Sequence, residues 1–298
     1  MENKEVAKYL ERIEIKGLWG RYDVDWKLNP DVNILVGENG TGKSTILDII
    51  FGLINEQEVS KDFNKFESCK LITNDKTEIS SKIIITSKGA NKVETKGEGI
   101  EFFVGMLNKI KTFDAPFYTK TEKELNRKPY IISTLDDDLD VILDKYVEYQ
   151  LNQTRKLRAN GKTYESVFAN QKYLIETINR LFAVTEKRVD EDENRLSFLR
   201  IDNAKIAAFE LSSGEKQLLI ILLTVLCQDE KPSILLLDEP ELSLDLSWQF
   251  ELINIIRQLD PNCQLIIITH SPGIYGKGWR DKVTFMENIV LQLKKQTA

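Results

Sequence analysis

The residues with the clearest chemical meaning stand at positions 37–44, which read GENGTGKS. This fits the pattern GxxxxGK[ST], in which glycines let backbone N–H groups turn inward around a phosphate. A helix N-terminus behind the loop adds partial positive charge, the lysine contacts the phosphates, and the final hydroxyl coordinates Mg²⁺. A bare turn is the alternative, but a strand-like run before the loop and a helical pattern after it favour phosphate binding. The nucleotide-binding residues expected here are Asn39, Gly40, Thr41, Gly42, Lys43, Ser44 and Thr45, with Ser44 also a Mg²⁺ ligand.

Two acidic residues, Asp238 and Glu239, follow directly after an apolar run at positions 234–237. If this run is a parallel strand, Asp238 lies at its carboxyl end and reaches the Mg²⁺ shell beside Ser44. Glu239 then stands where a carboxylate can accept the proton of a water that attacks the terminal phosphate. Two acids after a strand are weak evidence alone, but together with the phosphate loop they indicate nucleotide hydrolysis.

A third group, LSSGEKQ at positions 211–217, precedes a strongly apolar run. Ser212 and Glu215 have the spacing of a capping box, so a purely local role at a helix start is one interpretation. The serines, Gly214 and the helix N-terminus could instead bind a second anion. A chain that already has a phosphate loop needs such a site only if the site completes the nucleotide pocket of another subunit.

His270 is the one histidine of the chain and follows an apolar run at positions 265–268. A lone histidine is usually structural, but the carboxyl edge of an open α/β sheet is where ligands bind. Asp245 lies between the two acids and His270, in the segment Ser-Leu-Asp at positions 243–245. Taken alone, it would be interpreted as a helix N-cap.

In this order the groups resemble the motifs of an ATP-binding-cassette ATPase. The resemblance equates positions 37–44 with Walker A, 211–217 with the signature, 234–239 with Walker B, 243–245 with the D-loop and 270 with the switch histidine. It implies that ATP and Mg²⁺ are bound, with Ser44 and Asp238 on the metal. It also implies that Glu239 polarises the attacking water and that His270 holds the γ-phosphate. The remaining residues that it assigns to the nucleotide site are Ser212, Gly214, Glu215 and Asp245. Of these, Ser212 and Gly214 would touch the γ-phosphate bound by a partner subunit.

Within this superfamily the chain resembles the RecF/SMC-like branch, and in particular the compact AAA-type ATPases of prokaryotic defence and OLD-like systems. The segments DEPELSL at 238–244 and THSPGIY at 269–275 carry this similarity. Two features depart from the pattern. No glutamine can be assigned to the Q-loop, since Gln57 follows the phosphate loop too closely, and Asp245 stands where the branch often has histidine.

These motifs require an α/β fold that positions them, and the resemblance implies a P-loop ATPase head. We expect a mostly parallel core sheet, an antiparallel β subdomain and a helical lid. The apolar patterns predict a helix over 44–53, a helical hairpin over 133–189 that turns near 158–162, and parallel strands at 233–237 and 264–269. The predicted division is an N-terminal part of the head at 1–132, the lid at 133–194 and a C-terminal part of the head at 195–298.

Composition narrows the function classes. The 298 residues carry a net charge of −6, which excludes a uniformly basic coat for nucleic acid. The three cysteines form no CxxC pair, as expected for a reducing cytoplasm. The longest apolar run, at 218–227, is about half as long as a membrane helix requires, so no membrane span is expected.

The leading hypothesis is an ATPase whose ATP-bound heads pair as a homodimer or higher oligomer and control a separately encoded effector, in prokaryotic anti-phage defence. The alternative is a RecF-like ATPase of DNA repair or recombination that binds DNA directly. A transporter energiser is disfavoured by the long segment between Ser44 and Leu211. The basic residues behind the alternative are Lys120, Lys123, Arg127, Lys128, Arg155, Lys156, Arg158 and Lys162, although such clusters are usually solvated surface.

Overall fold

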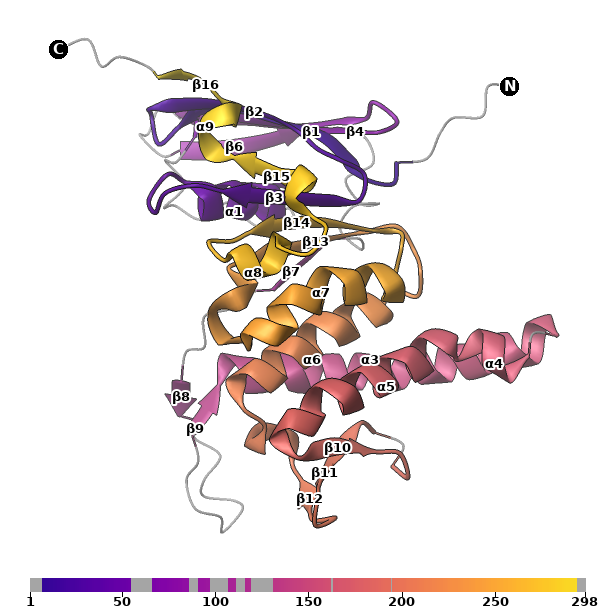
Figure 1. The fold of residues 1–298 in the computed structure, drawn as a ribbon. Helices are drawn as coiled ribbons and strands as arrows, with labels where there is room; N and C mark the ends of the chain where they lie inside the picture. The colour runs from indigo at the N-terminus through magenta and orange to yellow at the C-terminus, as the bar shows by residue number, and fades with distance from the viewer. Residues whose placement is uncertain are drawn as a thin grey trace. The chain divides into compact units, whose positions relative to one another are not determined.

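The computed structural model describes residues 7–54, 66–85, 91–96, 107–110, 116–118, 131–161, 163–193 and 195–293 (Figure 1). They belong to two compact units, each assembled from distant parts of the chain. Unit 1 comprises Met1–Ile110, Lys231–Glu239 and Asn262–Ala298, and unit 2 comprises Lys111–Glu230 and Pro240–Pro261. These units follow packing, whereas the three-part division expected from the sequence follows motifs and stays a prediction.

Unit 1 contains the parallel sheet that the apolar runs predicted. Its strand order is β15-β3-β14-β13-β7, and every neighbouring pair is parallel. All residues of β3 and β14 are buried, as expected for strands covered on both faces. The strands are β3 (Val32–Val36), β7 (Leu107–Ile110), β13 (Ser233–Asp238), β14 (Cys263–Ile268) and β15 (Val283–Phe285).

A second sheet in unit 1 is antiparallel throughout, in the order β16-β2-β1-β4-β5-β6, which confirms the expected β subdomain. In β1, the buried residues Ile13 and Ile15 alternate with more exposed charged residues. The strands are β1 (Leu10–Leu18), β2 (Tyr22–Lys27), β4 (Ser68–Thr73), β5 (Glu78–Ile85), β6 (Asn91–Lys96) and β16 (Val290–Leu293).

Helix α1 (Lys43–Ile54) lies between the two sheets of unit 1 (Figure 1). Its residues Ile46, Leu47 and Ile50 join one apolar core with residues of both sheets, among them Ile13 and Ile266. This packing holds the N-terminus of α1 at the carboxyl end of β3, where the phosphate loop connects the two elements.

A buried amide also ties the sheets together. The side chain of Gln264, in β14, donates to the carbonyl oxygens of Leu10 and Asn29, at 2.8 Å each. Its own oxygen accepts from the N–H of Leu10 at 2.9 Å. Because both ends of the amide are bonded, this polar group can be buried without a large desolvation penalty.

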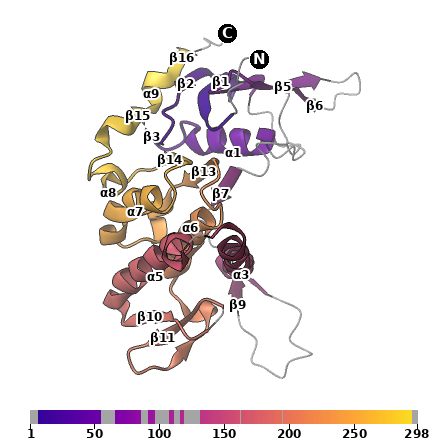
Figure 2. The ribbon, with the colours of Figure 1, turned by 90° about the vertical axis from the view of Figure 1, so that its right-hand side faces the viewer.

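Unit 2 is built around helix α6 (Ser213–Leu226), which packs against α3 (Thr134–Asn160), α5 (Ala169–Phe182) and α7 (Leu246–Leu259). Every residue of α6 after the first is buried, as expected for a helix that is apolar on all sides. Figure 2 views α3 and α5 nearly end-on. The short α4 (Tyr164–Val167) connects them, which confirms the expected helical hairpin over this range.

The helical pattern expected to continue to residue 189 ends earlier, and this part of the prediction is wrong. Helix α5 stops at Phe182, the turn η2 (Ala183–Thr185) follows, and β10 (Lys187–Asp190) begins two residues later. Glu186 between them has φ +56°, a left-handed conformation that cannot continue a helix. Strand β10 pairs with β11 (Ser197–Arg200), which pairs with β12 (Lys205–Ile206).

The remaining elements are short. In unit 1 they are α8 (Pro272–Tyr275), η5 (Arg280–Lys282) and α9 (Met286–Ile289), and in unit 2 the antiparallel pair β8 (Pro116–Tyr118) and β9 (Ile131–Ser133), η3 (Ala208–Glu210) and η4 (Pro240–Ser243). Among the residues that the structure describes, no helix has the length and apolar character needed to cross a membrane.

Candidate nucleotide site

The phosphate loop runs from the end of β3 into the first turn of α1. Gly40 and Gly42 have φ angles of +78° and +95°, so the loop depends on conformations that other residues rarely adopt. The ammonium of Lys43 is folded back into the loop, where it donates to the carbonyl oxygens of Gly37 at 3.0 Å and Glu38 at 2.8 Å. The loop therefore surrounds a cation with its own carbonyl groups, in the position from which a lysine can turn to a phosphate.

Lys43 is 5% exposed, and its environment acts on its charge in two directions. Burial lowers the pKa of the ammonium below its ordinary value, while the carboxylates of Glu239 and Asp238 act to raise it. The charge of the lysine thus lies close to both acids that the sequence assigned to catalysis.

The residues expected to hold Mg²⁺ come together. The hydroxyl of Ser44, at the start of α1, donates to Oδ1 of Asp238, at the end of β13, over 3.0 Å. Both residues lie at the carboxyl edge of the parallel sheet, because parallel strands end on the same side. One hydroxyl and one carboxylate are hard oxygen ligands, and they fit Mg²⁺, which typically takes one or two carboxylates together with phosphates and waters.

Glu239 and His270 face each other beside this pair. Nε2 of His270 lies 3.6 Å from Oε1 of Glu239, and both side chains are about one-third exposed. The backbone of Glu239 has φ +50°, an uncommon conformation for a residue with a side chain, and its N–H donates to the carbonyl oxygen of Ile268 at 2.8 Å. The bond to β14 thus holds a strained residue, of the kind found at functional sites.

The other loop residues take different places. Asn39 and Gly40 are exposed at the tip of the loop, and Thr45 is buried in α1. The hydroxyl of Thr41 donates to the carbonyl oxygen of Glu38 at 2.8 Å. All the residues assigned to the phosphate loop, the two acids and the histidine therefore belong to unit 1.

The signature segment belongs to unit 2 and has the capping box that its spacing allowed. The hydroxyl of Ser212 accepts from the N–H of Glu215 at 3.3 Å, and the carboxylate of Glu215 accepts from the N–H of Ser212 at 2.8 Å. Glu215 has no exposed surface, whereas Ser212 is exposed. Of the two predicted site residues, only Ser212 presents its side chain to solvent, and the contacts described for Glu215 are internal.

The signature and the D-loop contact each other directly. A Cβ atom on Gly214 would lie 2.2 Å from the carbonyl oxygen of Ser243, so glycine is required there by space alone. Asp245 is the N-cap of α7, and its carboxylate accepts from the N–H and the hydroxyl of Ser247 at 2.8 and 2.6 Å. These bonds lower the pKa of the Asp245 carboxyl.

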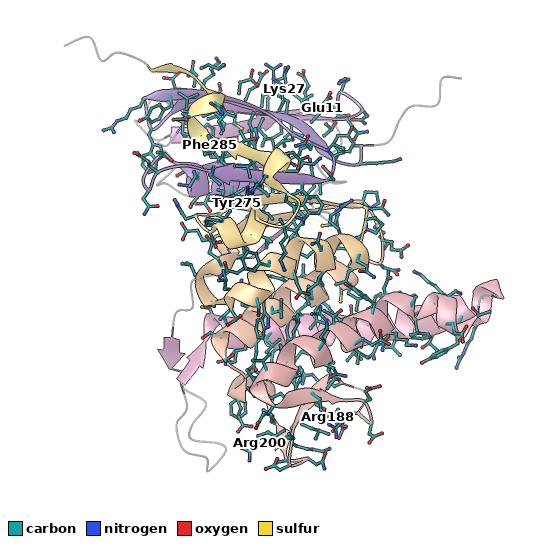
Figure 3. All side chains as sticks on the ribbon, viewed as in Figure 1. Glu11, Lys27, Arg188, Arg200, Tyr275 and Phe285 are labelled. Atoms are coloured by element: carbon teal, nitrogen blue, oxygen red, sulfur yellow. The ribbon has the colours of Figure 1, made fainter. Side chains whose placement is uncertain are left out.

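Two features near the phosphate loop were missed by the sequence reasoning. Trp19, 45% exposed and with φ +55°, lies against the loop, because a Cβ atom on Gly42 would be 3.0 Å from the indole nitrogen. A cavity of about 870 Å³ also borders the loop, lined by Glu38, His270 and aromatic residues that include Tyr275 and Phe285 (Figure 3). The sequence signal for the contact with Trp19 was the run GLWG at 17–20, which places a tryptophan between two glycines.

Comparison with known proteins shows the family to which the chain belongs. Residues 32–275 match the family described as "AAA domain, putative AbiEii toxin, Type IV TA system". The chain belongs to this AAA family. Among similar proteins is the phosphate import ATP-binding protein PstB of Ehrlichia ruminantium (strain Gardel), 38% identical over 87 residues. The match covers 29% of this chain and 33% of PstB, so the chain spans about a third of that relative.

Two further likenesses extend over most of this AAA-family chain. The Septu protein PtuA of Bacillus thuringiensis is 23% identical, over 88% of this chain and 72% of PtuA. The fold is similar to a crystallised SMC head bound to the C-winged helix domain of ScpA, with a TM-score of 0.53 and 15% identity over 90% of this chain and 91% of that one. These findings confirm the resemblance to a P-loop ATPase of the SMC/RecF-like, defence-associated kind, and the fold expected from it.

Proposed function

We propose that this AAA-family protein binds and hydrolyses ATP with Mg²⁺, that its ATP-bound heads pair, and that pairing controls a separately encoded effector in prokaryotic anti-phage defence. The observation that carries the proposal is the convergence of Ser44, Asp238, Glu239 and His270 beside the phosphate loop.

The residues act as follows. Lys43 exchanges its bonds to the carbonyl oxygens of Gly37 and Glu38 for bonds to phosphate oxygens. Ser44 and Asp238 would hold Mg²⁺, which when bound would neutralise charge on the β- and γ-phosphates. Glu239 accepts the proton of the attacking water, and its neighbour His270 donates to the γ-phosphate.

Pairing of heads is supported by the signature segment. Exposed Ser212 stands at the N-terminus of a helix, beside Gly214, in a chain with one phosphate loop. A helix N-terminus with an exposed hydroxyl suits a phosphate. We assign Ser212 and Gly214 to the γ-phosphate bound by a second copy, and Glu215 to holding them in place. Asp245, which caps α7, would keep the adjoining D-loop in position.

An effector protein is better supported than DNA as the partner. The family description names a toxin of a toxin–antitoxin system, and PtuA matches over most of the chain. Of the eight basic residues that suggested DNA, Lys156 is paired with Asp229. Arg155 and Arg158 are exposed on α3, where Arg155 donates to Asn152. The other five, Lys120, Lys123, Arg127, Lys128 and Lys162, lie outside the described residues. On the antiparallel sheet of unit 1, Arg12 and Lys70 are likewise paired with acids, which reduces the attraction for a phosphate backbone.

The experiment that tests nucleotide binding is the ATP-dependent shift of thermal unfolding for Lys43→Ala. Ligand at 100 times its Kd stabilises a folded protein by about 2.7 kcal/mol, and the wild type should show a shift of this order with Mg²⁺ and ATP. Lys43→Ala should unfold at a temperature close to that of the wild type without ATP, and should show no shift with it. Lys70→Ala, which removes a surface lysine paired with Glu78, is the matched control and should behave as the wild type. An ATP shift retained in Lys43→Ala would contradict the proposed function.

A further inference from the structure

A buried ion pair lies directly behind the signature segment. The ammonium of Lys187, in β10, donates to both carboxylate oxygens of Glu215, at 3.0 and 2.7 Å. The Lys187 side chain is 18% exposed and the Glu215 side chain has no exposed surface. The hydroxyl of Thr185 adds a third bond to the same carboxylate at 2.6 Å.

These donors are what allows a charge to remain at this position. Burial alone would raise the pKa of the Glu215 carboxyl, but the bonds from Lys187, Thr185 and the N–H of Ser212 outweigh it and hold the pKa below the ordinary value. Removing one member of such a buried pair leaves an uncompensated charge, which is far less favourable than the intact pair. Glu215 is therefore an ionised carboxylate whose position depends on Lys187.

The carboxylate in turn positions the signature segment. One of its oxygens accepts from the N–H of Ser212, the residue at the start of the segment. Lys187, Glu215 and Ser212 thus form a chain of bonds that runs from β10 to the exposed end of α6.

Tertiary structure places Lys187 at this point. The ring of Phe182, the last residue of α5, lies 5.8 Å from the rings of both Phe198 in β11 and Trp248 in α7. The left-handed turn at Glu186 then reverses the chain, so that β10 begins beside the start of α6. The next residue, Arg188, labelled in Figure 3, is exposed and donates to Asn203 at 2.8 Å, so its partner differs from that of Lys187.

We propose that Lys187 is a positioning residue for ATP hydrolysis: through Glu215 it fixes Ser212 in the orientation needed at the γ-phosphate bound by a second copy. This inference rests on the proposed function, because it assigns Ser212 to the nucleotide of a partner. Lys187 itself touches no nucleotide. Its removal should therefore reduce turnover without changing the affinity of the phosphate loop for ATP, which belongs to the other unit.

The test compares full-length variants at a temperature well below the unfolding transition of each, with rates divided by the folded fraction from circular dichroism. Lys187→Met removes the charge and keeps the length of the side chain. Arg188→Met removes the neighbouring charge on the same strand and is the matched control. Lys187→Arg keeps the charge, and the double variant Lys187→Met with Glu215→Gln removes both charges while an amide oxygen can still accept from Ser212.

We expect Lys187→Met to lose about 10²-fold in kcat, the effect typical of displacing a positioned group by about 1 Å, with an unchanged Kd for ATP measured by calorimetry. Lys187→Arg and Arg188→Met should stay within about threefold of the wild type, and the double variant should regain most of the lost kcat. The double variant and Lys187→Arg keep the test decisive if Lys187→Met does not fold.

Two results would overturn the inference. One is a kcat of Lys187→Met equal, per folded molecule, to that of Arg188→Met. The other is a double variant that regains thermal stability without regaining turnover, which would show that the loss of kcat does not arise from an unpaired Glu215 charge that displaces Ser212. Failure of the proposed function looks different, because the wild type itself would then neither bind nor hydrolyse ATP.

Discussion

The phosphate loop and the signature segment are both glycine-containing helix starts, and they use glycine for different reasons. In the phosphate loop, Gly40 and Gly42 have positive φ angles, so the backbone conformation requires glycine. In the signature, Gly214 is part of a helix, and glycine is required because the carbonyl oxygen of Ser243 would lie 2.2 Å from a Cβ atom. One glycine pattern creates a cradle for an anion, and the other lets two segments of the same unit approach each other.

The two helix starts also differ in charge. Helix α1 has no acidic residue in its first turn, whereas α6 has the buried Glu215 there. The positive end of α1 is therefore available to a phosphate, while that of α6 is already partly compensated by its own carboxylate. The comparison teaches that the phosphate loop is suited to bind an anion strongly by itself, and that the signature is suited to add a few oriented groups to an anion held elsewhere.

The largest effect should come from Glu239→Gln, which removes the proposed base beside the phosphate loop and leaves both helix starts intact. Loss of a general base lowers the rate by about 10²–10⁴-fold, while the amide keeps the shape of the side chain. ATP binding should survive, and the paired, ATP-bound state should accumulate, visible as a larger species in size-exclusion chromatography with ATP and Mg²⁺ than with ADP. Glu241→Gln is the control, and equal losses in both variants would take the role of base away from Glu239.

Intermediate losses of stability should come from alanine substitutions of Gly214, which is required by close packing, and of Gly40, which is required by its backbone conformation. Gly214→Ala forces Ser243 and the D-loop to move, and overpacking of this kind typically costs about 1–3 kcal/mol of stability together with a loss of turnover. Gly40→Ala meets no atom within 4 Å, so its cost is the left-handed backbone alone, about 1–2 kcal/mol. Urea unfolding of both variants measures these costs. If Gly214→Ala is as stable as the wild type, the close contact between signature and D-loop is wrong.

The smallest effect concerns Trp19, whose indole lies against Gly42. Trp26 and Trp248 are buried, Trp279 is partly exposed next to η5, and Trp19 is partly exposed beside the loop. ATP should therefore change the fluorescence of Trp19 with little change in stability. Trp19→Phe should lose most of the ATP-dependent signal and bind ATP with a free energy within about 1.5 kcal/mol of the wild type, the range of an aromatic contact. A signal that persists in Trp19→Phe would show that the reporting tryptophan lies elsewhere.

Local sequence was sufficient for the elements that carry the motifs. The apolar runs at 234–237 and 265–268 were recognisable as buried parallel strands because they lack the polar alternation of a half-exposed sheet. The pattern at 44–53 predicted α1 within a residue at each end. The helical pattern failed beyond Phe182, where the left-handed Glu186 and the pairing of β10 with β11 replace the helix.

In the nucleotide site, too, some features follow from local sequence and others only from tertiary structure. Residue types and spacing by themselves determined which groups could bind phosphate and Mg²⁺, because a phosphate loop is a local structure whose glycines, lysine and hydroxyl are neighbours in the chain. Only the tertiary structure decided that Ser44 bonds to Asp238, that Gly214 contacts Ser243, and that Lys187 supports Glu215. These contacts join residues far apart in sequence, and they depend on strand order, helix packing and burial, which no local pattern encodes.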